Sequence, residues 1–277
     1  MARRIVTWSI ALLLLLAFTE RAQSADVSVM GGELGADALW VAKIAWWDVR
    51  SIVTLPLAIP QLRELTWQQA LTGAVAVAAI GVTIGLDEDI RRSAKGIGSS
   101  TGREIQDVAT TVSWTTLGGL YAAGLVAGSE DWRHHALTGG EGAVVSMGLT
   151  TATKAAFGRQ RPDTNEGAYR WFAGGTSFVS DAATPHFAIS EAISESFDHA
   201  WWAVLPSYAV ATSVGVGRMG QDRHWASDVV GSAVLGAGTE KLFSFFHDNE
   251  QREEKPTPTV SILPRGGGLG LSVNWRF

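Results

Sequence analysis

Long segments with almost no charged side chains are the feature that most limits how this chain can fold. Glycine- and proline-bearing stretches separate the strongest of them, which span residues 67–86, 108–127, 143–157, 201–216 and 228–245. Each is long enough for several helical turns, and their frequent Ala and Gly residues let helices pack closely. A further helix with one polar face is expected at about residues 185–197. The sequence therefore predicts an all-α fold, a helical bundle of about six core helices.

The first residues have the pattern of a secretory signal peptide. Two arginines precede an apolar run at residues 5–18, and small residues just beyond it supply a cleavage point after Ser24. The run is short for a membrane-spanning helix, although a membrane anchor is the alternative interpretation. We therefore expect residues 1–24 to be removed and the mature chain to work outside the cytoplasm.

The C-terminal part of the chain has a different pattern. Residues 247–259 are polar and are interpreted as a linker, which leaves residues 25–246 as one helical domain. Residues 260–277 alternate apolar with small or polar side chains around a Pro-Arg-Gly-Gly-Gly turn, and this alternation predicts a short C-terminal β-hairpin. The role expected of the hairpin is an edge ribbon on the bundle or a contact with the envelope or a partner.

Composition excludes several kinds of function. The 277 residues carry a formal net charge of −5, so no nucleic-acid partner is expected. Cysteine is absent, which excludes disulfides and thiolate metal sites. The nearly charge-free segments make membrane embedding a serious alternative, but Glu191 and Glu195 would be costly at mid-bilayer. We expect a globular domain, with a membrane-surface contact as a further alternative.

The segment GRMGQDRHWASDVVG, residues 217–231, carries the clearest chemical pattern. His224 and Asp228 are four residues apart, so on a helix they share a face. The carboxylate can then hold one imidazole nitrogen while the other points outward, which is the geometry of an oriented nucleophile. An ordinary capping and helix-surface pair is the alternative. The pattern alone does not decide between them.

A second pattern lies upstream in TKAAFGRQRPD, residues 153–163. Lys154 is followed after six residues by Arg161 and Pro162, and the proline should end or redirect the chain. A lysine at a helix end and an arginine on the following loop can converge on one anion. With Arg218 they offer one point charge and two bidentate forks, which suits a phosphoryl group. Cations that merely favour a helix C-terminus are the alternative.

The joint spacing of these residues resembles the phosphatidic acid phosphatase type 2 / vanadium haloperoxidase superfamily, over about residues 142–238. The signature of that superfamily is Lys-x6-Arg-Pro, then Pro-Ser-Gly-His, then Ser-Arg-x5-His-x3-Asp. The first part is complete here, and in the third Gly217 replaces the serine. The resemblance implies that Lys154, Arg161 and Arg218 bind phosphate. It also implies that His224 attacks in line to give a phosphohistidine, that Asp228 orients it, and that no metal is required.

The second part of the signature departs from the family pattern. The text is GGTSFVSDAATPHFAIS, and an alignment without gaps puts Ser180 on the phosphate-binding serine, Asp181 on the glycine and Ala182 on the histidine. His186 lies four residues further on, so it is a candidate proton donor, either one helical turn along or through a short insertion. It could equally be a polar residue near a helix start. Asp181 would repel a phosphate dianion, so it points away as a cap, is protonated, or signals altered substrate or lost activity.

Together these patterns indicate a cell-envelope phosphatase that acts on phosphomonoesters or lipid phosphates, placed in the periplasm by its leader. Its partner is expected to be a phosphorylated small molecule or a lipid phosphate, with no resident metal or other cofactor. Alternatives are a haloperoxidase with vanadate as cofactor, and a catalytically impaired interaction protein of the same fold. An integral or peripheral membrane protein with a periplasmic active site is the alternative location. His134 is interpreted as part of a polar loop, and residues 87–92 are interpreted as a solvated helix end.

Overall fold

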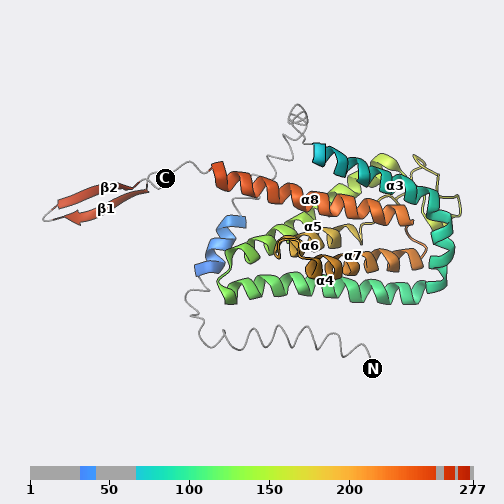
Figure 1. Cartoon of the computed structure of the whole chain (residues 1–277), viewed down its shortest axis with the longest axis horizontal. Coiled ribbons are helices and arrows are strands. Elements are labelled where there is room, and N and C mark those ends of the chain that lie inside the picture. Colours follow the sequence, from blue (N-terminus) through green and yellow to red (C-terminus); the bar gives the residue numbers. More distant parts are fainter. Residues whose placement is uncertain (1–31, 42–66, 254–258, 266–267, 275–277) are drawn as a thin grey trace, which may run out of the picture. The chain divides into compact units, whose positions relative to one another are not determined.

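The computed structural model describes residues 32–41, 67–253, 259–265 and 268–274. The chain divides into two compact units, Met1–Phe243 and Ser244–Phe277. The expected signal peptide, residues 1–24, lies outside the described residues. Beyond a helical segment at residues 32–41, the principal helices are α3 (Trp67–Ala94), α4 (Ser99–Ala127), α5 (Glu130–Phe157), α6 (Thr184–Glu195), α7 (Trp201–Gly220) and α8 (Ala226–Glu253) (Figure 1).

The turn between α4 and α5 shows why these helices begin and end where they do. Gly128 ends α4 in the left-handed conformation with φ 65°, which glycine adopts without strain. The hydroxyl of Ser129 then accepts a hydrogen bond from the backbone N–H of Trp132, and acidic residues occupy the first turn of α5. Helix α5 therefore begins well before residue 143, where the predicted apolar segment starts, and it includes His134. The prediction that His134 belongs to a polar loop is wrong.

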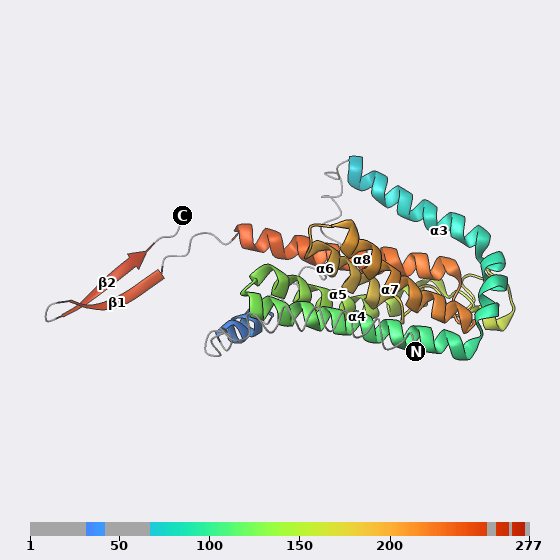
Figure 2. The ribbon, with the colours of Figure 1, turned by 60° about the horizontal axis from the view of Figure 1, so that its bottom comes forward.

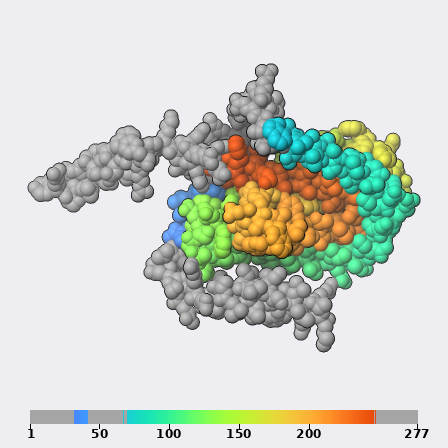
Figure 3. Space-filling view, in the orientation of Figure 1, coloured from blue at the N-terminus to red at the C-terminus, as the bar shows by residue number. Residues whose placement is uncertain are grey.

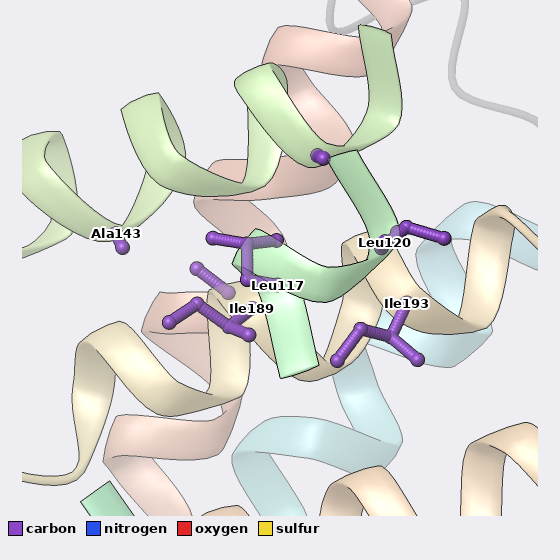
Figure 4. Close-up of a cluster of buried hydrophobic side chains, with 7 residues drawn as sticks. Leu117, Leu120, Ala143, Ile189 and Ile193 are labelled. Atoms are coloured by element: carbon purple, nitrogen blue, oxygen red, sulfur yellow. The ribbon is translucent and has the colours of Figure 1, made fainter. Parts of the chain in front are cut away.

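The core forms where α4, α5 and α6 meet (Figure 4). Small residues set the spacing, because a Cβ placed on Gly139 of α5 would lie 2.4 Å from the Cβ of Ala192 on α6. The buried side chains of this cluster are Leu117, Leu120, Ala136, Ala143, Ala188, Ile189 and Ile193.

Helix α6 lies inside the bundle, which corrects the prediction of a polar-faced helix. All of its residues from Thr184 to Ser194 are buried. Several of its polar side chains have partners inside the protein, since the Ser190 hydroxyl donates to the Ser207 carbonyl at 2.8 Å, whereas Nδ1 of His186 is buried without a hydrogen-bond partner among the described residues. Glu191 accepts hydrogen bonds from the Tyr208 hydroxyl and the Lys241 ammonium group. The polar face is therefore directed at other helices instead of water.

Helix α3 differs from the others because most of its apolar surface is unpartnered. Among the described residues it is the one helix long and apolar enough to cross a membrane, over residues 70–97. Its exposed large side chains are Trp67, Leu71, Val75, Val77, Val82 and Leu86. Figure 2 shows its N-terminal end diverging from the other helices and its C-terminal end meeting them, and Figure 3 shows it at the surface of the helical unit.

The expected combination of a helical bundle with a hairpin needs a correction. The described residues of Met1–Phe243 contain helices and no strand, so the fold class of this unit is all-α alone. Strands β1 (Thr259–Arg265) and β2 (Gly268–Asn274) belong to the second unit and pair antiparallel with each other. The expected linker is also misplaced, because α8 continues through it to Glu253. The two strands pair with each other within the second unit, so they are not part of the all-α fold.

Candidate active site

The ends of three helices and one long loop supply the candidate site. Lys154 lies in the last turn of α5, Arg218 in the last turn of α7, and Asp228 in the first turn of α8. The loop between α5 and α6 contributes Arg161, and His224 immediately precedes α8. The charges of Arg161, Asp228 and Arg218 all influence the pKa of Lys154, so these groups lie close together.

The imidazole of His224 is buried and held in one orientation. Its Nδ1 lies 2.9 Å from the carbonyl oxygen of Ser177, and only a protonated nitrogen can donate to a carbonyl. When the ring is neutral, its lone pair is therefore on Nε2, which is buried and makes no hydrogen bond among the described residues, with Oδ1 of Asp181 3.5 Å away. Asp228 was expected to hold this ring, but its Oδ2 lies 3.5 Å from Nδ1. The nearer support is the backbone carbonyl, with Asp228 acting mainly through its charge.

Asp228 is itself held by a dense set of donors. Its carboxylate accepts from the Ser177 hydroxyl at 2.5 Å, the Trp225 backbone N–H at 2.9 Å and Arg159 at 2.6 Å. Burial would raise the pKa of Asp228, but the neighbouring His224, Arg159 and Ser177 together lower it. The carboxylate therefore stays ionised beside the imidazole, where it stabilises positive charge.

Arg159 is a buried residue of the candidate site that the sequence interpretation missed. Its guanidinium is fully buried and bonds to the Ser227 hydroxyl at 2.7 Å and to Asp87 at 2.7 Å, in addition to Asp228. Asp87 also accepts from the backbone N–H of Ser227 at 2.9 Å. The prediction that residues 87–92 form a solvated helix end is therefore wrong for Asp87, whereas Asp89 and Arg92 are exposed near the end of α3. The available signal for Arg159 was its place two residues before Arg161, inside the segment expected to bind phosphate.

The cations of the site have unused hydrogen-bonding capacity. The Nε atoms of Arg161 and Arg218 and the hydroxyl of Ser180 are buried without a hydrogen-bond partner among the described residues. Lys154 donates to the Thr176 carbonyl at 2.7 Å. Burial lowers the pKa of both Lys154 and Arg218, so their charged forms would be stabilised by an anion. We call Lys154, Arg161, Ser180 and Arg218 the anion cradle.

Gly217, which replaces the serine of the family pattern, has a packing role. A Cβ at this position would lie 2.5 Å from the backbone oxygen of Gly102 on α4. A Cβ at Gly102 would likewise lie 2.6 Å from the oxygen of Gly217. The two helices therefore touch through their backbones next to Arg218, and a serine at this position would separate them.

Asp181 faces the anion cradle. Its Oδ1 lies 3.7 Å from Nζ of Lys154 and 3.5 Å from Nε2 of His224. The pKa of Asp181 is lowered by His224 first, and then by Lys154 and Arg218, so the carboxylate is ionised. Of the expected alternatives, a cap pointing away and a protonated side chain both disagree with this geometry. The third, an altered substrate or lost activity, is not tested by it.

His186, the candidate proton donor, contacts side chains of α4. Its Nε2 lies 3.3 Å from the Thr110 hydroxyl, and its ring meets Trp114 edge-on at 6.3 Å, both on α4. Burial lowers the pKa of His186 to about 4. The interactions of His186 with other described residues thus lead to α4, and the structure does not join it to the anion cradle.

One other group of side chains has ligand-like geometry. The ligand atoms of Glu191, Glu195 and His199 lie within 4.8 Å of one another. The ammonium group of Lys241 already contacts the Glu191 carboxylate, and Nε2 of His199 lies 3.1 Å from Oε1 of Glu191. A cation is therefore not needed to balance this carboxylate, and the cluster stabilises the α6–α8 contact.

Comparisons with known proteins identify the segment that carries the site. Residues 136–252, from α5 to α8, match the family described as the PAP2 superfamily. The lipid A 1-phosphatase of Porphyromonas gingivalis is 28% identical over 160 residues, which is 58% of this chain and 34% of that protein. The match therefore spans about a third of the length of that relative. No solved structure matches the chain at a significant level.

Proposed function

We propose that the protein is a phosphatase that hydrolyses phosphomonoesters, with lipid phosphates as its natural class, through a phosphohistidine on His224, because residues 136–252 match the family described as the PAP2 superfamily. The observation that carries this proposal is the state of the His224 ring. Its Nδ1 is fixed by the Ser177 carbonyl, and its buried Nε2 lacks a hydrogen-bond partner among the described residues and lies beside the anion cradle. The similarity to a lipid A 1-phosphatase supports the lipid class.

The proposed reaction has two displacements at phosphorus. In the first, Nε2 of His224 attacks, the P–N bond forms, and the bond from phosphorus to the leaving oxygen breaks. The imidazole gains positive charge, which Asp228 stabilises at 3.5 Å. In the second, water attacks phosphorus, the P–N bond breaks, and orthophosphate is released.

The anion cradle supplies the electrostatic stabilisation of this proposed reaction. Charge accumulates on the three equatorial oxygens of the transferring group, and Lys154, Arg161 and Arg218 are the cations placed to meet it. Arginine forks pair with such oxygens bidentately, and lysine acts as a point charge. We therefore propose catalysis by protein cations alone, without a metal ion. His186 contacts α4, so we propose water as the proton donor to the leaving group.

We further propose that the protein works at a membrane surface on the outer side of the cytoplasmic membrane. The exposed apolar face of α3 supports this, because apolar patches of this kind mark membrane or partner contacts. Asp87, near the end of the same helix, bonds to Ser227 and Arg159 behind His224. A membrane contact through α3 would thus hold the site close to lipid head groups.

Substitution of the nucleophile tests the proposed function. His224→Gln should abolish release of p-nitrophenol from p-nitrophenyl phosphate while leaving the circular dichroism spectrum unchanged, because no neighbouring group can replace Nε2. His135→Gln, a histidine on the body of α5, is the matched control and should keep wild-type turnover. Assays in EDTA should match those without it. Undiminished turnover in folded His224→Gln would remove His224 from the mechanism, and EDTA inhibition reversed by a divalent cation would remove the metal-free proposal.

A further inference from the structure

The carboxylate of Asp181 lies where a bound phosphoryl group would have to lie. Its Oδ1 is 3.7 Å from Lys154 Nζ and 3.5 Å from His224 Nε2, the atom proposed to attack phosphorus. A phosphoryl group in line for that attack would contact the same two nitrogens. A carboxylate resembles a phosphoryl group in its negative charge and its paired acceptor oxygens, so the cations of the anion cradle can bind either one.

The electrostatics of the site agree with an internal anion. Lys154 and Arg218 are partly buried, and the negative charge of Asp181 opposes the effect of that burial on both of them. Asp181 thus compensates part of the positive charge of the cradle before any ligand arrives. An incoming phosphate dianion would meet a cradle of reduced charge and a carboxylate that repels it.

The side chain can leave while its backbone stays. The side chain of Asp181 is 54% exposed, so a rotation takes its carboxylate into water. The neighbouring backbone is fixed, since the N–H of Ser180 donates to the Ser232 hydroxyl at 2.9 Å and the N–H of Ala183 donates to the Ser180 carbonyl at 3.2 Å. Displacement therefore requires a change of rotamer and leaves the α5–α6 loop in place.

Building on the proposed function, we propose that Asp181 is a specificity-determining residue whose carboxylate occupies the anion cradle of the free protein, so that a phosphoryl group binds only by displacing it. Free orthophosphate contacts the protein only through the anion cradle. The free energy needed to displace Asp181 therefore weakens its binding in full. A phosphoryl group carried on a larger organic group offsets the cost through its other contacts. The site is thereby selective against small inorganic anions, including its own product.

Anion binding to the full-length chain tests this inference without requiring turnover. The dissociation constants of orthophosphate and orthovanadate are measured by titration calorimetry for wild type, Asp181→Asn and Asp181→Gly. Both variants should bind both anions more tightly by about tenfold or more, the factor that corresponds to losing one like-charge contact. Asp163→Asn is the matched control, because Asp163 is an exposed carboxylate of the same loop that pairs with Arg223 at 3.1 Å. It should bind both anions as wild type does.

The outcomes separate this inference from the proposed function. Equal anion affinity in wild type and both Asp181 variants would overturn the role of Asp181. Tighter binding in the Asp181 variants, with no hydrolysis of any phosphomonoester by wild type, would support that role and overturn the proposed hydrolysis. If Asp181→Gly loses its native circular dichroism, Asp181→Asn decides, because asparagine keeps the side-chain volume and removes only the charge.

Discussion

At the scale of single residues, the imidazole of His224 is held by one backbone carbonyl and by the charge of Asp228. The spacing of the two motifs was enough to predict that Lys154, Arg161, Arg218 and His224 lie close together, because a lysine, two arginines and a histidine at fixed intervals rarely coincide. The Ser177 carbonyl could not be identified, since any residue type offers that atom. Arg159 was also missed, because its partners Asp87 and Asp228 lie far from it in sequence.

Removal of the Asp228 charge should damage both catalysis and stability. Asp228→Asn keeps the volume but leaves the buried guanidinium of Arg159 with one carboxylate fewer. We expect kcat on p-nitrophenyl phosphate to fall by about 10²–10⁴-fold, since charge behind a catalytic imidazole has effects of this size. Loss of one partner of a buried pair should lower the free energy of unfolding by about 3–5 kcal/mol. Thermal unfolding and steady-state assays measure the two effects. An active, equally stable variant would contradict this role.

His186 should make the stability of the protein depend on pH. Burial lowers its pKa to about 4, whereas an unfolded histidine has a pKa of about 6.5. Between these values the unfolded state binds more protons, so stability is complete above about pH 6.5 and is lost as pH falls towards 4. The shift corresponds to roughly 3 kcal/mol.

The His186→Gln variant isolates this dependence, because other titrating groups cancel in the comparison. Glutamine can keep a hydrogen bond to Thr110, and denaturant titrations at several pH values give the difference in unfolding free energy from wild type. That difference should narrow as pH falls from 6.5 to 4.

The His186→Gln variant should also lose no more activity on an alkyl phosphate than on p-nitrophenyl phosphate if water is the proton donor. A selective loss on the alkyl ester would restore His186 to that role.

At the scale of elements, polar residues in two helices determine how the site is supported. In α6 the polar face is buried, because Ser190 and Glu191 have partners on α7 and α8. In α3 an apolar stretch ends at the buried Asp87, which accepts hydrogen bonds from Ser227 of α8. Hydrophobic pattern predicts where such helices form, but it does not predict partners that another helix supplies.

The exposed face of α3 should bind lipid bilayers. Val77→Asp combined with Val82→Asp places two charges on highly exposed positions of α3, so it should reduce binding to phospholipid vesicles by about tenfold or more. Turnover of soluble p-nitrophenyl phosphate should be unchanged, since neither valine contacts the site. Val144→Asp, at an exposed valine of α5, is the control for added charge. Co-sedimentation measures binding, and equal sedimentation of all three proteins would exclude α3 as the membrane contact.

At the scale of the whole molecule, the helical unit carries every residue proposed to act on phosphate. The long apolar segments predicted where the principal helices form. The end of α8 at Glu253 could not be predicted, since the polar residues there have the composition of a linker and include good helix formers. The strands β1 and β2 pair with each other and are not part of the all-α unit.

Trapping of the covalent intermediate tests the central claim most directly. Wild-type protein is mixed with phosphate-labelled substrate, quenched in alkali within the first turnover, digested and mapped by mass spectrometry. Phosphohistidine survives alkali and is lost in acid, so the account predicts an alkali-stable, acid-labile phosphoryl group on the peptide that contains His224. The same label should be absent from His224→Gln. A phosphoryl group on another residue, or rapid turnover with no labelled peptide at all, would contradict His224 as the nucleophile.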